Sequence, residues 1–210
     1  MKLYSYWRSS CSWRVRIALE LKGIDYMYVP VHLVKNGGEQ HQDSYTAHNP
    51  MAQVPTLELS DGTMLTQSIA IIEYLDEQFP NGPALLPRDP LARAKTRSHA
   101  ELINAGIQPL QNLSVLQALS AMGQDKLAWG RQVIDRGLTA LEKLTAPNQT
   151  PFLGGAQPTI ADLCLVPQLY NARRFKCDLS QYPYLTAVEA NCQQLEAFQK
   201  AHPDQMPDAQ

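Results

Sequence analysis

Short apolar runs separated by polar stretches mark the first part of the chain. Met1–Tyr6 is rich in apolar and aromatic side chains and predicts a strand. Cys11–Lys22 predicts a helix, because its apolar residues recur at helical spacing. The apolar face comprises Val15, Ala18 and Leu19, and the charged residues elsewhere on the helix are Arg14, Arg16, Glu20 and Lys22. Gly23 then suits the left-handed residue that ends many helices.

A second strand and a long polar loop follow. Tyr26–Val31 is apolar and aromatic and predicts a strand. Its Pro30 cannot donate a hydrogen bond within a sheet, so we expect this strand at a sheet edge. The polar loop Leu33–Tyr45 is long for a compact domain, which favours a functional role.

A hairpin and a further helix come next. Thr56–Ser60 and Thr63–Gln67 flank Asp61–Gly62, a dipeptide typical of tight hairpin turns. Ser68 is a good helix cap, and it predicts the start of an apolar helix over Ile69–Phe79. The order of elements is therefore strand, helix, strand, loop, hairpin and helix, which describes a thioredoxin-like α/β arrangement.

The rest of the chain lacks convincing strand signals and predicts an all-α domain. We place the thioredoxin-like domain at residues 1–82, a proline-rich linker at 83–90 and the helical domain at 91–210. The helices expected in the second domain are Leu91–Leu119, Asp125–Leu144, Thr159–Phe175 and Tyr184–Ala201. The third begins with a sequence like a capping box, with Asp162 three residues after Thr159, and its Pro167 predicts a kink.

Composition excludes several classes of function. With 18 basic and 20 acidic side chains the formal net charge is −2, which argues against a nucleic-acid partner. There is no apolar run long enough for a membrane span and no secretory signal at the N-terminus. The five histidines lack metal-ligand spacing, so we expect no metal. Four widely separated cysteines are not a disulfide framework, which favours the cytoplasm.

Candidate chemistry lies at the start of the first predicted helix, in "SSC" (Ser9, Ser10 and Cys11). Free backbone N–H groups and the helix dipole stabilise an anion there, and a thiolate is an anion. A dithiol redox site needs a second cysteine three residues on, where the chain has Arg14. Two readings stay open: Cys11 is the nucleophile, or the site activates a thiol that a ligand brings.

Two further features favour the second reading. In a thioredoxin-like layout Val54–Pro55 is a candidate cis peptide bond, with the Val54 N–H and C=O available to an extended, peptide-like ligand. Ser68, preceded by Gln67, begins another helix and provides a second anion site, suited to a carboxylate. A thiol site, a peptide-pairing edge and a carboxylate site at one end of a sheet match the tripeptide glutathione.

The chain resembles the zeta-class glutathione transferases over essentially its whole length. The class-specific part is "SSCSWRVR", and "NPMAQVPTLELSDG", "QSIAIIEYLDEQFP", "IQPLQNLSVL" and "TIADLCLVPQLYNARRFKCDLSQYP" are also similar to the family. The resemblance implies a thioredoxin-like glutathione-binding domain, an all-helical substrate-binding domain, a homodimer and glutathione as cofactor.

Matching motifs imply a glutathione site built from both domains. Around the glutathione sulfur the resemblance implies Ser9, Ser10 and Cys11, with the Ser9 hydroxyl bonded to the thiolate and Cys11 tuning the site. For the rest of glutathione it implies Gln40 at the glycine end, Val54 at the cysteinyl backbone, Gln67 and Ser68 at the γ-glutamyl carboxylate, and Gln108, Asn112 and Ser114 from the helical domain.

The implied reaction converts a cis enedioyl acid, maleylacetoacetate, to its trans isomer in tyrosine and phenylalanine breakdown. It proceeds by thiolate addition, rotation and elimination, and it requires cations for the carboxylate of a dicarboxylic or keto acid substrate. We choose Arg8 and Arg174, because Arg pairs bidentately with carboxylates, although Arg173 is an alternative to Arg174.

Other functions stay open from the sequence. One is the isomerisation of maleylpyruvate in gentisate breakdown by the same chemistry. A second is general glutathione transfer or dehalogenation of small α-halo acids. Outside the enzymes, the alternative is a non-catalytic glutathione-binding module, which the hydroxyl and sulfur groups at Ser9–Cys11 disfavour.

Overall fold

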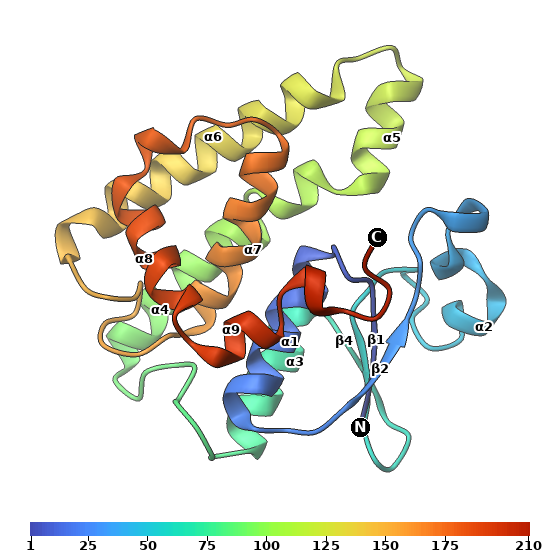
Figure 1. Ribbon diagram of the computed structural model, residues 1–210, viewed down its shortest axis with the longest axis horizontal. Coiled ribbons are helices and arrows are strands. Elements are labelled where there is room, and N and C mark those ends of the chain that lie inside the picture. The colour runs from blue at the N-terminus through green and yellow to red at the C-terminus, as the bar shows by residue number, and fades with distance from the viewer. The chain divides into compact units, whose positions relative to one another are not determined.

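The computed structural model describes residues 1–210, and the chain divides into two compact units (Figure 1). Met1–Leu85 and Leu195–Gln210 form the first unit, and Leu86–Gln194 forms the second. The sequence analysis instead assigned the last residues to the helical domain. The structure differs because Phe198 is buried and the helix that carries it packs against the first helix of the chain.

The first unit contains one four-stranded sheet. Its strands are β1 (Lys2–Ser5), β2 (Met27–Pro30), β3 (Thr56–Glu58) and β4 (Met64–Thr66). The order is β2-β1-β3-β4, with β1 and β2 parallel and the other two pairs antiparallel. The edge position predicted for the strand that contains Pro30 is confirmed, and so is the hairpin around Asp61–Gly62. This is the thioredoxin-like arrangement that the sequence predicted.

Helices α1 (Ser10–Lys22) and α3 (Ser68–Gln78) pack against each other in the first unit. Gly23 ends α1 with a φ of 64°, and the Ile24 N–H donates to the Leu19 carbonyl at 3.0 Å, as in a Schellman motif. Three of the charged residues that the sequence places off the apolar face of this helix are buried. They are Arg14, Arg16 and Lys22.

The start of α3 also differs from the prediction. Gln67 occupies the cap position with a φ of 68°, and Ser68 is the first helical residue. Ser68 does not cap the helix because its hydroxyl accepts a hydrogen bond from buried Arg14. The polar loop before the hairpin holds three short helical turns, Lys35–Gly37, Glu39–His41 and α2 (Asp43–Thr46).

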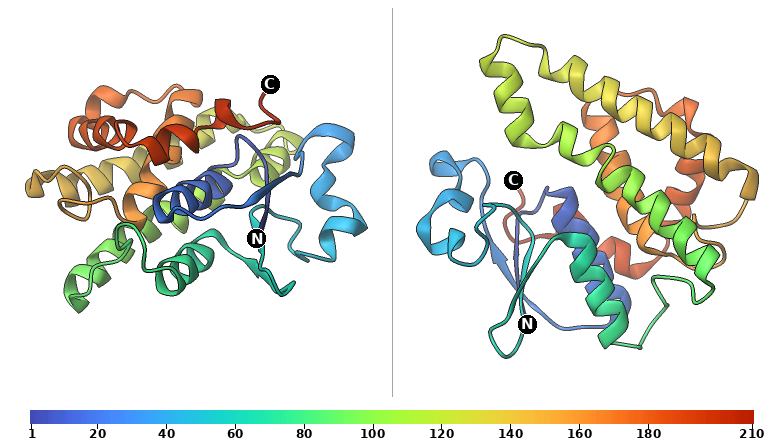
Figure 2. Two further views of the ribbon diagram at one scale, coloured as in Figure 1. Left: turned by 60° about the horizontal axis from the view of Figure 1, so that its bottom comes forward. Right: turned by 180° about the vertical axis from the view of Figure 1, so that it is seen from behind.

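The second unit is entirely helical, as predicted (Figure 2). Its α-helices are α4 (Pro90–Asn104), α5 (Leu113–Ala121), α6 (Lys126–Thr145), α7 (Ile160–Arg174) and α8 (Pro183–Gln193), with 3₁₀ turns at Gln108–Gln111, Ala146–Asn148 and Leu179–Gln181. No helix of the chain is long and apolar enough to cross a membrane.

Two helix predictions in this region are wrong. The expected helix Leu91–Leu119 is interrupted after Asn104, because Pro109 lacks the N–H that a continuing helix needs. The expected helix Tyr184–Ala201 is two helices, α8 and α9 (Glu196–Lys200), and α9 belongs to the first unit.

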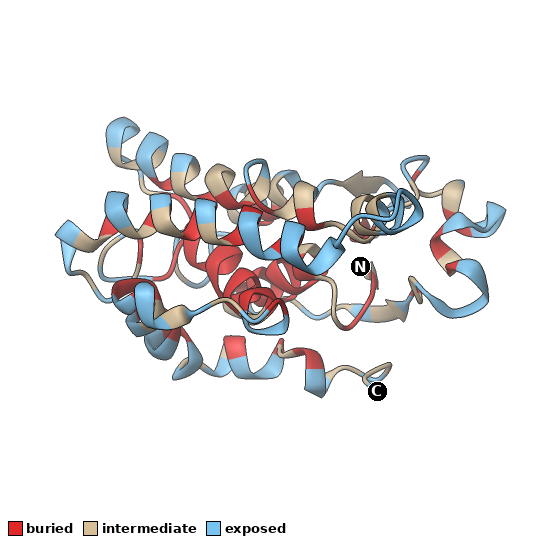
Figure 3. Ribbon diagram, turned by 90° about the horizontal axis from the view of Figure 1, so that it is seen from above, coloured by how far each residue is buried: buried red, intermediate tan, exposed pale blue.

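Helix α7 forms the centre of the second unit's core. Figure 3 shows that buried residues lie on the inward faces of the helices, and α7 is buried along nearly its whole length. Its capping box is present as expected: the Asp162 carboxylate accepts from the Thr159 N–H at 2.7 Å and from the Leu153 N–H at 2.8 Å. Pro167 lies inside the helix.

Candidate active site

The start of α1 offers hydrogen-bond donors that suit an anion, and one of them is the Ser9 hydroxyl. The Ser9 Oγ accepts a hydrogen bond from the Ser12 N–H at 3.2 Å, which caps the helix. The Ser9 hydroxyl hydrogen is therefore free to point at a ligand. The N–H groups of Ser10 and Cys11 make no hydrogen bond within the protein. Together with the helix dipole, these donors favour a negatively charged atom.

Two residues beside this helix start complete its surroundings. Cys11 is half-buried and is not in a disulfide. Arg8 is half-buried, and its guanidinium lies 5.2 Å from the centre of the Trp7 ring. Such stacking on an aromatic ring holds a cation in place while it stays available to an anion. Arg8 is thus an anchored positive charge next to Ser9.

Val54 provides an unpaired segment of backbone. The Val54–Pro55 bond is cis, as predicted, and the Val54 N–H and C=O make no hydrogen bond within the protein. The Val54 side chain packs in a cluster with Tyr6 and Trp7, which precede Ser9 in the chain. The free backbone edge therefore lies near the loop that leads into α1, where it suits an extended, peptide-like ligand.

The start of α3 forms a second anion site. Ser68 is buried, and its Oγ accepts from the Arg14 guanidinium at 3.3 Å. The N–H groups of Ser68 and Ile69 have no partner in the protein, and Gln67 is exposed beside them. The fully buried Arg14 adds positive charge beside the start of α3, where the helix dipole already favours an anion.

Sequence reasoning missed Arg14 as part of this site. Through its hydrogen bond to Ser68, Arg14 connects α1 with the start of α3 in the first unit. The signal in the sequence was the spacing of Arg14 and Arg16. Two charges two residues apart point to different sides of a helix, which does not fit a single solvated face.

Gln40 offers a buried acceptor that has no partner. Its Nε2 donates to the Leu33 carbonyl at 3.4 Å, while its Oε1 is buried without a hydrogen bond. Gly38 leaves the space that the Gln40 amide fills, because a Cβ at position 38 would lie 2.5 Å from Nε2. A buried oxygen of this kind is suited to a ligand N–H, since an unpaired buried polar atom is costly.

The remaining predicted residues lie in the second unit. Gln108 is half-buried in the 3₁₀ turn after α4, Asn112 stands at the cap position of α5, and Ser114 is exposed in α5. They do not lie on the first helix of this domain, as the sequence analysis assumed. Gln111, which the sequence analysis did not select, is buried among them, and its Nε2 donates to the Gln168 Oε1 at 2.9 Å.

The two candidate arginines of α7 have different surroundings. The Arg173 guanidinium forms a two-pronged ion pair with Glu189, whose side chain is buried. Arg174 is exposed at the end of α7 and donates to the Asn171 Oδ1 at 3.3 Å. Arg173 is thus engaged with a carboxylate of the protein.

Family models match both units of the chain. The family model for the glutathione S-transferase N-terminal domain matches residues 8–78, and that for the C-terminal domain matches residues 89–190. Maleylacetoacetate isomerase from Mus musculus is 50% identical over 206 residues, which cover 98% of this chain and 94% of that protein. The maleylacetoacetate isomerase from Pseudomonas aeruginosa is 46% identical over 211 residues, covering 98% or more of both chains.

Solved structures of maleylpyruvate and maleylacetoacetate isomerases are also similar to this chain. A bacterial maleylpyruvate isomerase, described as a zeta-class glutathione S-transferase, has a TM-score of 0.95 and 44% identity with full coverage of both chains. Maleylacetoacetate isomerase from Anaeromyxobacter dehalogenans with bound glutathione has a TM-score of 0.90 and 50% identity, covering 100% of this chain and 97% of that one.

The fold and the family matches over both units define a glutathione transferase, and the chain belongs to the glutathione S-transferase family. Within that family, the resemblance to the zeta class that "SSCSWRVR" indicated is confirmed. The predicted fold class is confirmed as well.

Proposed function

We propose that the protein is a glutathione-dependent cis–trans isomerase that converts maleylacetoacetate to fumarylacetoacetate in tyrosine and phenylalanine breakdown. Relatives named maleylacetoacetate isomerase are 46–50% identical to it over nearly the whole chain. The observation that carries the mechanism is the start of α1, where the Ser9 hydroxyl and the N–H groups of Ser10 and Cys11 have no acceptor within the protein.

The residues of the first unit fit glutathione. The unpaired N–H and C=O of Val54 suit the cysteinyl backbone, and the buried, partnerless Oε1 of Gln40 suits a donor at the glycine end. The N–H groups at the start of α3, with Ser68 and Gln67, suit the γ-glutamyl carboxylate. We assign Gln108, Asn112 and Ser114 to the same ligand on the family resemblance.

Glutathione, when bound, supplies a thiolate whose reversible addition to the double bond permits rotation. The chain's own task is to keep that sulfur ionised at neutral pH. The Ser9 hydroxyl donates to it, because a thiolate can only accept and Ser9 keeps its hydroxyl hydrogen free while its Oγ accepts from the Ser12 N–H. The N–H groups of Ser10 and Cys11 add two aligned donors, and the half-buried Cys11 side chain shapes the site.

The substrate is an anion, so the enzyme also needs fixed cations. Arg8, stacked on Trp7, lies next to the thiolate position and is suited to the oxygen on which charge develops. Arg174, exposed at the end of α7, is suited to the substrate carboxylate, because Arg pairs bidentately with carboxylates. These roles make Arg8 and Arg174 binding and charge-stabilising groups rather than proton donors.

The experiment that tests this proposal compares two substrates with and without glutathione. We expect faster turnover of maleylacetoacetate than of maleylpyruvate, and no turnover of either without glutathione. A strong preference for maleylpyruvate would favour the second candidate, which the maleylpyruvate isomerase with a TM-score of 0.95 supports. Binding of glutathione without turnover of either substrate would leave the non-catalytic binding module.

We also propose a cytoplasmic homodimer. The four cysteines are all free thiols, which suits a reducing compartment. Dimerisation rests on the family resemblance. Analytical ultracentrifugation tests it, with an expected mass of twice the 23.5 kDa of one chain, whereas a 23.5 kDa species would contradict it.

A further inference from the structure

The last residues of the chain return to the first unit. We call Leu195–Gln210 the C-terminal tail. Its helix α9 packs against α1, and the tail lies beside α1 in the views of Figures 1 and 2. Three of its residues are almost fully buried, namely Phe198, Ala201 and Pro203. The tail is therefore a packed part of the unit that contains the thiol site.

One tail carboxylate joins two separate segments of this unit. The Asp208 Oδ2 accepts a hydrogen bond from the Trp7 N–H at 3.2 Å, and its Oδ1 accepts from the Tyr28 hydroxyl at 2.7 Å. Trp7 lies in the loop before α1, and Tyr28 lies on edge strand β2. Asp208 thus ties the loop that precedes Ser9 to the sheet.

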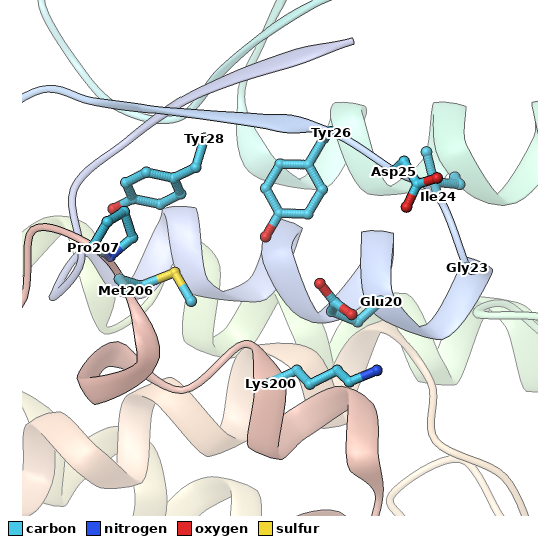
Figure 4. A pocket seen from close by; sticks show the side chains of 9 residues that line it. All are labelled: Glu20, Gly23, Ile24, Asp25, Tyr26, Tyr28, Lys200, Met206 and Pro207. Atoms are coloured by element: carbon cyan, nitrogen blue, oxygen red, sulfur yellow. The ribbon is translucent and has the colours of Figure 1, made fainter.

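The neighbours of Asp208 in the tail are packed as well. Met206 and Ala209 contact an apolar cluster of the first unit. The buried members of that cluster are Tyr6, Trp7, Val31, Tyr45 and Val54. Figure 4 shows Met206 and Pro207 beside the ring of Tyr28, along one side of a shallow groove. The cluster includes Val54 and the two residues before Arg8, so the tail packs against both Val54 and the segment that leads to Ser9.

The carbonyl of Trp7 accepts a hydrogen bond from Arg16, which is itself bonded to the tail. The Arg16 Nη2 donates to the Trp7 carbonyl at 2.9 Å, and the Arg16 Nε donates to the Ala201 carbonyl of the tail at 3.1 Å. Arg16 is fully buried, so these bonds are shielded from water. Both backbone groups of Trp7 are therefore bound, one directly by the tail and one through Arg16.

From this arrangement we infer that the C-terminal tail positions the thiol site, with Asp208 as a positioning residue for the turn Tyr6–Ser9. This turn determines where the Ser9 hydroxyl and the N–H groups of Ser10 and Cys11 point, since the Ser9 N–H itself donates to the Tyr6 carbonyl at 3.0 Å. Loosening Trp7 moves these donors away from the sulfur. The inference rests on the proposed function, because it concerns how that site activates glutathione.

The test compares Asp208→Asn with a matched aspartate of the same tail. Asn keeps the size of Asp208 but removes its charge, so the bonds to the Trp7 N–H and the Tyr28 hydroxyl lose their charge assistance, and the amide NH2 cannot accept from either group. Asp204→Asn changes an exposed carboxylate that contacts neither residue. For each protein we would measure the pKa of the glutathione thiol when bound, by thiolate absorbance, and kcat/KM for isomerisation.

We expect Asp208→Asn to raise the pKa of the bound thiol by about one unit and to lower kcat/KM about tenfold, with Asp204→Asn unchanged in both. Simple removal of a negative charge near the sulfur predicts the opposite sign, a lower thiol pKa. Tyr28→Phe removes the bond from Asp208 to the sheet, together with the hydrogen bond between Tyr28 and Ser5, and leaves the bond from Asp208 to Trp7 in place, so we expect a smaller change in the same direction.

A purely stabilising tail gives a different pattern. In that case Asp208→Asn lowers the thermal midpoint but leaves the thiol pKa and kcat/KM at the wild-type values, and the inference is overturned. If Asp208→Asn does not fold, Tyr28→Phe decides between the same two outcomes. Failure of the wild-type protein to isomerise either substrate would overturn the proposed function, whereas the thiol pKa of the bound glutathione would still report on the tail.

Discussion

Replacing Ser9 by Ala removes two interactions whose sizes can be separated. The first is the helix cap, in which Ser9 Oγ accepts from the Ser12 N–H. At 3.2 Å this bond is at the long end of the normal range, so we expect a loss of about 0.5–1 kcal/mol in unfolding free energy. The second is the hydrogen bond to the thiolate of glutathione, for which a charged acceptor gives about 1.5–3 kcal/mol.

The expected result is therefore a large catalytic effect with a small structural one. We expect kcat/KM to fall roughly 10- to 100-fold and the pKa of the bound thiol to rise by about one to two units. The thermal midpoint should fall by only about 2 °C. The assay is steady-state isomerisation with glutathione, combined with thiolate absorbance across a pH series.

Three variants separate the cap from the hydroxyl. Ser9→Gly keeps most of the capping but lacks the hydroxyl, so it should match Ser9→Ala in activity. Ser9→Thr keeps the hydroxyl and should restore most of the rate. Asp89→Ala removes an equivalent cap, the bond from the Ala92 N–H at 2.8 Å, in the second unit and should leave the thiol pKa unchanged. A Ser9→Ala enzyme with wild-type turnover and thiol pKa would refute the role of this hydroxyl.

Three further predictions concern the second unit. Arg174→Ala should raise KM for the anionic substrate about tenfold at unchanged thermal stability, which steady-state kinetics would measure. Arg173→Ala should instead lower the unfolding free energy by about 2 kcal/mol in a urea titration, because it leaves the buried Glu189 carboxylate without its partner. Burial raises the pKa of Asp162 from 3.8 to about 6, so the folded chain holds that proton at higher pH than the unfolded chain. The contribution of Asp162 to stability should therefore fall as pH rises from about 4 to 6, and the urea midpoint of Asp162→Asn should lack this pH dependence. Gln111→Leu or Gln168→Leu alone should destabilise by about 1–3 kcal/mol, because each leaves a buried amide unpaired, and in a double-mutant cycle by urea unfolding the pair changed together should cost less than the sum.

Local chemistry explains which elements could be predicted from the sequence. The hairpin at Asp61–Gly62 was predictable because its turn is self-contained: Gly62 adopts a φ of 85°, and the Asp61 carboxylate accepts from the Thr63 N–H at 2.9 Å. The end of α1 at Gly23 has the same local origin. Such signals depend on neighbours a few residues away, which the sequence displays directly.

Partners far apart in the chain explain what could not be predicted. Arg16 has the appearance of a solvated helix residue, yet it is fully buried because its guanidinium bonds the carbonyl of Ala201, 185 residues later. Arg14 likewise bonds Ser68 across 54 residues. No local pattern reveals such partners, so the sequence indicates only that both arginines lie off the apolar face of the helix and does not reveal their burial.

Helix interruption is an intermediate case. Apolar periodicity continues from α4 into α5, and on this basis a single helix was predicted. One signal that outweighs it is visible in the sequence, because Pro109 lacks an N–H and disfavours helical backbone at Gln108. The structure adds a close approach that the sequence does not show: a Cβ at Gly106 would lie 2.5 Å from the Leu102 carbonyl oxygen. The candidate residues Gln108 and Asn112 consequently belong to a turn and a helix start rather than to a helix face.

The central claim is that glutathione acts as a recycled cofactor at the Ser9–Cys11 helix start. The most direct measurement supplies maleylacetoacetate in large excess over glutathione and follows both the trans product and the free thiol count. A recycled cofactor gives product far in excess of the glutathione added, with the thiol count unchanged at the end. Consumption of one glutathione for each substrate molecule, or conversion at the same rate when glutathione is left out, would contradict it.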